Sequence, residues 1–185
     1  RGMFAFAIWD QKERSLFAAR DRLGIKPFHY WTDGNRKLAF ASELKALLEF
    51  IPDRKANTTL ARQFLAWNLL DHEPGETMVS GIMRLPPGHA MVWRQGEGLK
   101  IWRYWELHVN DEPRVSPEQE SRLILGFRQI FEETVSLHLR SDVPVGTCLS
   151  GGLDSSTIVC VVNLELQRRR LEEKPSQHTF SACFE

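Results

Sequence analysis

The chain has 185 residues, of which 42% are hydrophobic and 26% are charged, and these are ordinary proportions for a globular protein. Its 24 Lys and Arg residues balance its 24 Asp and Glu residues, so the charge favours neither a nucleic-acid nor an anionic-membrane partner. No apolar run approaches the roughly 20 residues of a membrane-spanning helix, and the length fits one domain or two small ones.

Strands separated by turns are predicted for much of the first hundred residues. Asp33-Gly34 is typical of a type I′ hairpin turn, and Pro86-Pro87-Gly88 predicts a stiff turn into a later strand. The apolar stretches of the first fifty residues predict a β-meander that ends in a helix. The predicted strands span residues 3–9, 15–19, 27–31, 37–41, 89–93 and 100–107.

Two helices are predicted between these strands. Ser42 is expected to cap a short helix over residues 43–50. Thr58 or Thr59 is expected to cap a second helix that continues to Leu70, because apolar residues recur there at helical spacing.

A change to polar composition near residues 110–115 predicts a boundary between two domains, 1–110 and 117–185, joined by a linker at 111–116. Ser116-Pro117-Glu118-Gln119 then begins a helix: Ser is the N-cap, Pro occupies the first position and Gln closes a capping box. Apolar residues recur every four positions as far as Leu139, which predicts an amphipathic helix of about 20 residues.

The most informative stretch is Ser150-Gly151-Gly152-Leu153-Asp154-Ser155. It lies between an apolar strand over 143–149 and an apolar helix, and a further strand over 178–184 would complete a βαβ unit. Adjacent glycines allow positive φ and close approach of a ligand, while the N–H groups at a helix start attract anions. Asp154 adds a carboxylate that can hold Mg²⁺. No lysine follows the glycines, so the loop is not a Walker A loop.

These residues match S-G-G-x-D-S, the signature of the ATP pyrophosphatase (PP-loop) enzymes. Further motifs lie elsewhere in the chain. They are Gly2-Met3-Phe4-Ala5-Phe6-Ala7, Arg20-Asp21-Arg22-Leu23-Gly24-Ile25-Lys26-Pro27, Phe40-Ala41-Ser42-Glu43, Leu85-Pro86-Pro87-Gly88-His89 and Arg103-Tyr104-Trp105 before the predicted linker, and Ser141-Asp142-Val143-Pro144-Val145-Gly146 after it. Together the two parts of the chain resemble glutamine-dependent asparagine synthetase. The resemblance implies an α+β fold, the later half of an N-terminal-nucleophile (Ntn) glutaminase β-sandwich, followed by the α/β start of a PP-loop synthetase domain.

The resemblance also implies the reaction and its ligands. Glutamine hydrolysis supplies ammonia, and ATP with Mg²⁺ activates aspartate as an acyl-adenylate that becomes asparagine. The nucleophilic cysteine would lie upstream of Arg1, so no catalytic residue is assigned, and the chain is expected to be an internal, inactive piece of a longer protein. Asp154 would hold Mg²⁺. The nucleotide-binding positions would be Cys148, Ser150, Gly151, Gly152, Asp154, Ser155 and Ala182.

Other residues carry weaker expectations. Asp21 and Glu43 invite a catalytic role, but both match family positions that order loops. The three cysteines, Cys148, Cys160 and Cys183, are expected to be small buried hydrophobic residues in a reducing compartment, which favours the cytoplasm. The expected partners are aspartate, glutamine and ATP, with no nucleic acid and no membrane, and a homodimer is left open.

Three alternatives differ in chemistry. A related amidotransferase or cyclase would adenylate a carboxylate other than aspartate. A non-catalytic nucleotide-binding module would keep the loop without the reaction. An RNA-modifying PP-loop enzyme is disfavoured by the zero net charge and by the Ntn-like first half.

Overall fold

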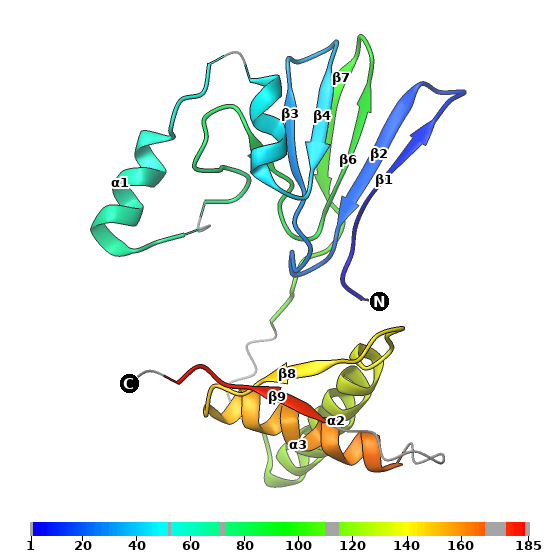
Figure 1. The fold of residues 1–185 in the computed structure, drawn as a ribbon. Coiled ribbons are helices and arrows are strands. Elements are labelled where there is room, and N and C mark those ends of the chain that lie inside the picture. Colours follow the sequence, from blue (N-terminus) through cyan, green and yellow to red (C-terminus); the bar gives the residue numbers. More distant parts are fainter. Residues whose placement is uncertain (1, 52, 71–72, 110–114, 169–176, 184–185) are drawn as a thin grey trace. The chain divides into compact units, whose positions relative to one another are not determined.

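The structure is a computed structural model that describes residues 2–51, 53–70, 73–109, 115–168 and 177–183 (Figure 1). The chain divides into two compact units, Arg1–Val109 and Asn110–Glu185. The predicted linker at 111–116 falls largely on residues 110–114, which lie outside the described residues. None of the helices in the described ranges combines the length and the apolar character needed to cross a membrane.

The first unit contains two antiparallel sheets (Figure 1). One has the strand order β1-β2-β6-β7 and the other has the order β4-β3-β5. The strands are β1 (Ala5–Asp10), β2 (Ser15–Arg20), β3 (His29–Thr32), β4 (Leu38–Ala41), β5 (Met83–Arg84), β6 (His89–Arg94) and β7 (Gly98–Arg103).

The predicted β-meander is wrong in one respect. β1 and β2 form a hairpin, as do β3 and β4, but β2 pairs with β6 and not with β3. The segment between β2 and β3 bends around the buried Asp21, which accepts backbone N–H groups from Leu23, Ile25 and Lys26.

The core of the first unit is a cluster to which both sheets contribute. Its members share near-complete burial, so they are the side chains whose removal from water stabilises this unit. The cluster consists of Leu16, Ala18, Phe28, Tyr30, Leu85, Met91 and Trp93. A second cluster of Leu47, Ile51 and Ile82 fixes the short 3₁₀ helix η1 (Leu44–Phe50) near β3 and β4.

Both predicted caps in the first unit are wrong. The N-cap of η1 is Glu43, not Ser42, and it makes no side-chain capping bond. The helix α1 (Thr58–Trp67) is capped by Asn57, whose side chain accepts the Leu60 N–H at 3.3 Å. This helix ends before the predicted Leu70 because Asn68 adopts the left-handed conformation, with φ at +54°.

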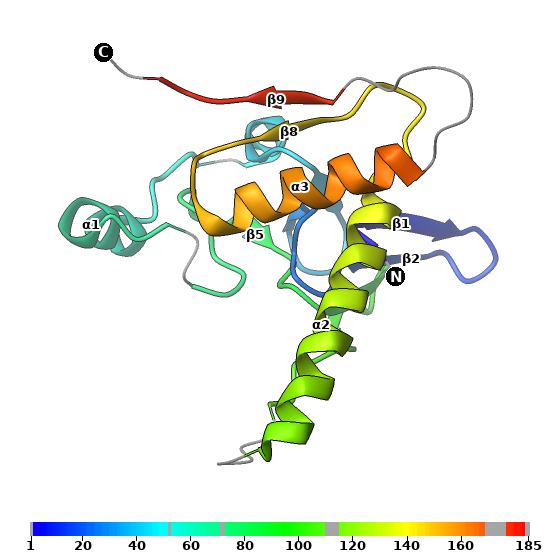
Figure 2. The ribbon, with the colours of Figure 1, turned by 90° about the horizontal axis from the view of Figure 1, so that it is seen from below.

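The second unit is a βαβ arrangement with one additional helix. It contains α2 (Pro117–His138), β8 (Gly146–Cys148), α3 (Leu153–Arg168) and β9 (His178–Phe180). β8 and β9 pair in parallel, which confirms the predicted βαβ unit. Figure 2 shows α3 running along β8 and crossing α2, and α3 contacts both elements. The predicted helix end near 170 lies outside the described residues. The predicted strand end at 184 is wrong, because β9 ends at Phe180 and residues 181–183 are not in a strand.

The start of α2 follows the predicted chemistry. The Ser116 hydroxyl accepts the Gln119 N–H at 3.2 Å, and the Gln119 side-chain oxygen accepts the Ser116 N–H at 2.8 Å. Pro117 occupies the first helical position. The capping box is therefore complete, and it satisfies N–H groups that have no partner inside the helix.

Candidate functional site

The glycine loop, residues 149–152, connects β8 to α3. The Leu149 N–H donates to the Phe180 carbonyl at 2.8 Å, and the Ser181 hydroxyl donates to the Leu149 carbonyl at 2.8 Å. Gly151 then takes a φ of +84°, which costs a glycine little. A Cβ added to Gly151 would meet no atom within 4 Å, so the backbone at this turn faces open space.

Two serine hydroxyls close the glycine loop. Ser150 Oγ lies 3.0 Å from Ser155 Oγ, and the Ser155 hydroxyl donates to the Gly152 carbonyl at 3.1 Å. The structure therefore brings together Ser150, the two glycines and Ser155, four of the residues predicted to bind a nucleotide.

The first turn of α3 faces the same loop. The Ser156 N–H donates to the Gly152 carbonyl at 3.1 Å, whereas the earlier N–H groups of a helix have no partner inside it. Asp154 lies in this turn and is exposed, and its carboxylate makes no hydrogen bond or ion pair with other described residues. The N–H groups suit an anion, and the carboxylate is available to a cation.

The other two predicted nucleotide positions lie beside the loop. Cys148 is the last residue of β8 and is paired with Phe180, and Ala182 follows two residues beyond Phe180. The expected burial of Cys148, Cys160 and Cys183 is wrong, because all three are exposed free cysteines. Among the described elements α3 and β9 pack against β8, and many apolar residues of this unit remain exposed.

Asp154 does not belong to a cluster of potential metal ligands among the described residues. The described residues contain no group of three or more His, Cys, Asp or Glu side chains that could hold a metal ion. Mg²⁺ is often bound through one or two carboxylates, its own waters and the phosphates of a substrate. An exposed carboxylate beside phosphate-attracting N–H groups fits that mode of binding.

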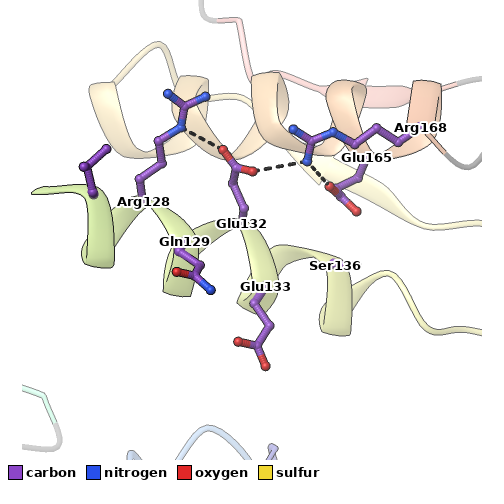
Figure 3. A pocket seen from close by; sticks show the side chains of 8 residues that line it. Arg128, Gln129, Glu132, Glu133, Ser136, Glu165 and Arg168 are labelled. Atoms are coloured by element: carbon purple, nitrogen blue, oxygen red, sulfur yellow. Dashed lines mark hydrogen bonds and ion pairs between the residues drawn. The ribbon is translucent and has the colours of Figure 1, made fainter.

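A groove of about 480 Å³ lies elsewhere in the second unit, between α2 and α3. The ion pair between Arg168 and Glu132 crosses it, and none of its lining residues belongs to the glycine loop (Figure 3). The groove is therefore a feature of the helix packing and is separate from the predicted nucleotide site.

Asp21 accepts more backbone N–H groups than any other carboxylate among the described residues of the first unit. It is 2% exposed, and four backbone N–H groups donate to it, from Phe4 (3.3 Å), Leu23 (3.2 Å), Ile25 (3.0 Å) and Lys26 (2.9 Å). Burial alone would raise the pKa of this carboxyl, but the four donors outweigh it and the pKa lies below its ordinary value. Asp21 thus orders the loop over 21–27, as predicted.

Arg20 supports this loop from the neighbouring position, which sequence reasoning did not reveal. Its guanidinium donates to the carbonyls of Gly24 (2.6 Å), Lys26 (2.7 Å) and Leu85 (2.8 Å). Glu43, by contrast, is exposed and pairs with Lys45 at 2.6 Å. No side-chain capping bond supports the loop-ordering role that was expected for Glu43.

Comparison with known families divides the chain into two parts. Residues 1–105 match the family described as glutamine amidotransferase domain. Residues 126–185, which include the glycine loop, match the asparagine synthase family.

Individual relatives align with the whole chain. Glutamine-hydrolysing asparagine synthetase 3 of Bacillus subtilis is 40% identical over all 185 residues, and the chain spans 28% of its length. A putative glutamine-hydrolysing asparagine synthetase 2 of Methanocaldococcus jannaschii is 34% identical, and the chain spans 34% of its length. Amidase chyE of Penicillium rubens is 36% identical, with 27% of its length spanned. Because the match over residues 1–105 covers more than half of the chain, the protein belongs to the glutamine amidotransferase domain family, and a segment similar to asparagine synthase follows in the same polypeptide.

Proposed function

We propose that the whole protein containing this chain is an ATP-dependent, glutamine-hydrolysing asparagine synthetase. One observation carries the proposal: a glutamine amidotransferase match is followed, in the same chain, by an asparagine synthase match that includes the glycine loop. A nitrogen-releasing domain next to a nucleotide loop suits a reaction in which ammonia attacks an activated carboxylate.

The proposed chemistry has two half-reactions. In the first, a cysteine nucleophile upstream of Arg1 hydrolyses glutamine to glutamate and ammonia. In the second, an aspartate side-chain carboxylate oxygen attacks the α-phosphorus of ATP and pyrophosphate leaves. Ammonia then attacks the acyl carbon of the aspartyl-adenylate, loses a proton, and expels AMP to give asparagine.

The glycine loop would hold the phosphates in this reaction. The N–H groups at the start of α3 and the Ser150 hydroxyl are fixed donors for the negative charge that develops as pyrophosphate leaves. Cys148 and Ala182 would flank the nucleotide, and Ser155 would keep Ser150 in place through the 3.0 Å contact. Asp154 would hold Mg²⁺, which neutralises phosphate charge when it is bound.

The same proposal includes the boundary between the two domains and the subcellular location of the enzyme. The two family matches leave residues 106–125 between them, and the predicted linker at 111–116 falls inside that interval. The three free cysteines suit a reducing compartment, and we therefore propose a cytoplasmic enzyme.

A second candidate differs only in the acceptor. Two relatives are named amidases, chyE of Penicillium rubens and chry2 of Gibberella zeae, at 36% and 34% identity. Because these names do not mention asparagine, the second candidate is an amidotransferase that forms an amide from a carboxylate other than that of aspartate.

An isotope-transfer experiment tests the proposal. The full-length protein is incubated with ATP, Mg²⁺, glutamine and aspartate whose side-chain carboxylate carries ¹⁸O. Adenylation predicts that one ¹⁸O atom appears in AMP for each asparagine formed. ADP and inorganic phosphate as products would contradict adenylation. Absence of turnover with aspartate, with AMP formed from another acid, would favour the second candidate. Absence of any ATP-dependent turnover would favour a non-catalytic module.

A further inference from the structure

A chain of ion pairs joins α2 to the C-terminal end of α3 (Figure 3). Glu132 of α2 accepts the Arg128 Nε–H at 2.9 Å through one carboxylate oxygen and an Arg168 Nη1–H at 3.2 Å through the other. Arg168 Nη1 also donates to Glu165 at 2.7 Å. Of these three contacts, Arg168 to Glu132 is the one that connects the two helices.

The two glutamates that take part in these ion pairs are partly shielded from water. The Glu132 side chain is 22% exposed and the Glu165 side chain is 12% exposed, whereas Arg168 is 57% exposed. Salt screens charges in such partly buried positions less than charges on an open surface. Hydrogen bonds from Arg128 and then Arg168 hold the pKa of Glu132 below its ordinary value, so its carboxylate stays ionised at neutral pH.

The opposite end of α3 begins at the glycine turn. Gly151 and Gly152 have no Cβ, so hydrogen bonds, and no packing by a side chain of either glycine, hold the start of the helix at this turn. The orientation of the first turn therefore also depends on where the rest of α3 is held. Val162 is the buried residue of α3, and Arg168 is its last residue.

The glycine loop lies farther from Val162 along α3 than Arg168 does. At 1.5 Å per residue, Val162 is about 14 Å from Leu153 at the loop and about 9 Å from Arg168 at the ion pair. If the helix turns about Val162, a displacement at Arg168 is enlarged about 1.5-fold at the glycine loop by this same geometry. Shifts of about 1 Å at a phosphate site can matter greatly, because donors must meet oxygens at hydrogen-bond distance.

We propose that Glu132 is a positioning residue for the glycine loop, acting through Arg168 to set the direction of α3. This inference rests on the proposed nucleotide-binding function of the loop. Glu132 contacts no part of the loop itself among the described interactions, so its effect is one of orientation.

The test uses the full-length enzyme and four variants. The variants E132Q and R168Q each remove the connection between the helices, and E132Q/R168Q removes both partners. R128Q is the matched control, because it removes only the pair within α2. We measure the Kd for ATP in the presence of Mg²⁺ by calorimetry, at least 20 °C below each variant's unfolding midpoint.

We expect E132Q and R168Q each to raise the Kd for ATP about three- to tenfold. The Kd of the double variant should not exceed the higher of the two single-variant values, since each single variant already breaks the contact between the helices. R128Q should stay within about twofold of wild type, and R168K should recover part of the affinity because it keeps the charge. Unchanged Kd values in E132Q and R168Q, or an equal effect of R128Q, would overturn the inference alone. Failure of the wild-type enzyme to bind ATP would overturn it together with the proposed function.

Discussion

The hydroxyl oxygens of Ser150 and Ser155 lie 3.0 Å apart across the glycine loop. Ser155 has a single hydroxyl proton, and it donates that proton to the Gly152 carbonyl at 3.1 Å. Ser150 must therefore be the donor in the bond between the two serines. A phosphate oxygen that reached this loop would compete with Ser155 for the Ser150 proton, so Ser150 is the hydroxyl that a ligand can recruit.

The first prediction concerns this donor. Ser150→Ala should weaken the binding of ATP with Mg²⁺ to the full-length enzyme by about 1–2 kcal/mol, or roughly five- to thirtyfold, because one hydroxyl donor to a charged oxygen is lost. Calorimetric titration measures the difference. The control is Thr157→Val, since the Thr157 hydroxyl donates to the Leu153 carbonyl one turn into α3 and does not face the loop turn. Equal affinity of wild type and the Ser150 variant would refute the assigned role.

The second prediction concerns the carboxylate. Asp154→Ala in the full-length enzyme should lower ATP-dependent synthesis by at least about a hundredfold, because the proposed Mg²⁺ ligand is removed, while glutamine hydrolysis continues. Coupled assays of asparagine and glutamate formation separate the two activities. Glu120→Ala is a matched control: it removes an exposed acid from the first turn of a different helix, α2. Synthesis that survives in the Asp154 variant would exclude this residue as an essential ligand.

The parts of the fold that the sequence predicts are those decided by neighbouring residues. The capping box at Ser116 and Gln119 forms because both partners lie within one helical turn. The βαβ order around the glycine loop follows from apolar runs and adjacent glycines, and it too is confirmed. What the loop binds stays a prediction.

Other features depend on residues far apart in sequence, and these were predicted less well. β2 pairs with β6, more than seventy residues later, and not with its neighbour β3. The cysteines lie in apolar patterns but are exposed. Their burial was predicted wrongly because an apolar pattern does not reveal how many elements pack over it. At α1, Asn57 and Thr58 are both acceptable caps by residue type, and the backbone geometry selects Asn57.

The third prediction concerns Asp21. Asp21→Asn should lower the free energy of unfolding of the first unit by about 2–4 kcal/mol at pH 7, because an amide cannot accept four backbone N–H groups as a carboxylate does. All six tryptophans lie within residues 9–105, so tryptophan fluorescence during urea unfolding reports on this unit. Asp10→Asn is the control. Asp10 is exposed and accepts two N–H groups, from Lys12 and Glu13, so the loss should be smaller.

The same carboxylate gives a pH dependence of known sign. The folded-state pKa of Asp21 lies below the ordinary value of 3.8, so the unfolded state binds a proton more readily. The stabilisation is therefore complete above the unfolded-state pKa and is lost as pH falls through the folded-state pKa. The difference between wild type and Asp21→Asn should shrink below about pH 4. A difference that is constant from pH 6 to pH 3 would contradict this account.

The fourth prediction concerns Gly88, which ties the Asp21 loop to the end of β7. Its N–H donates to the Asp21 carbonyl at 2.9 Å, and its carbonyl accepts the Tyr104 N–H at 2.9 Å. Its φ is +67°, and a Cβ added there would lie 2.7 Å from the Trp105 carbonyl oxygen. Gly88→Ala should therefore destabilise the first unit by about 2–3 kcal/mol, since backbone strain adds to a contact that cannot relax freely.

Gly126 offers a control of opposite sign for Gly88→Ala. It lies inside α2, and an added Cβ would meet no atom within 4 Å. Gly126→Ala should stabilise α2 by about 0.5–1 kcal/mol, because alanine loses less backbone entropy in a helix. Far-UV circular dichroism follows mainly the helices, of which α2, with 22 residues, is the longest among those described, while tryptophan fluorescence follows the first unit. A fluorescence midpoint for Gly88→Ala equal to that of wild type would show that the loop accepts the Cβ, and that the contact with Trp105 does not hold this turn.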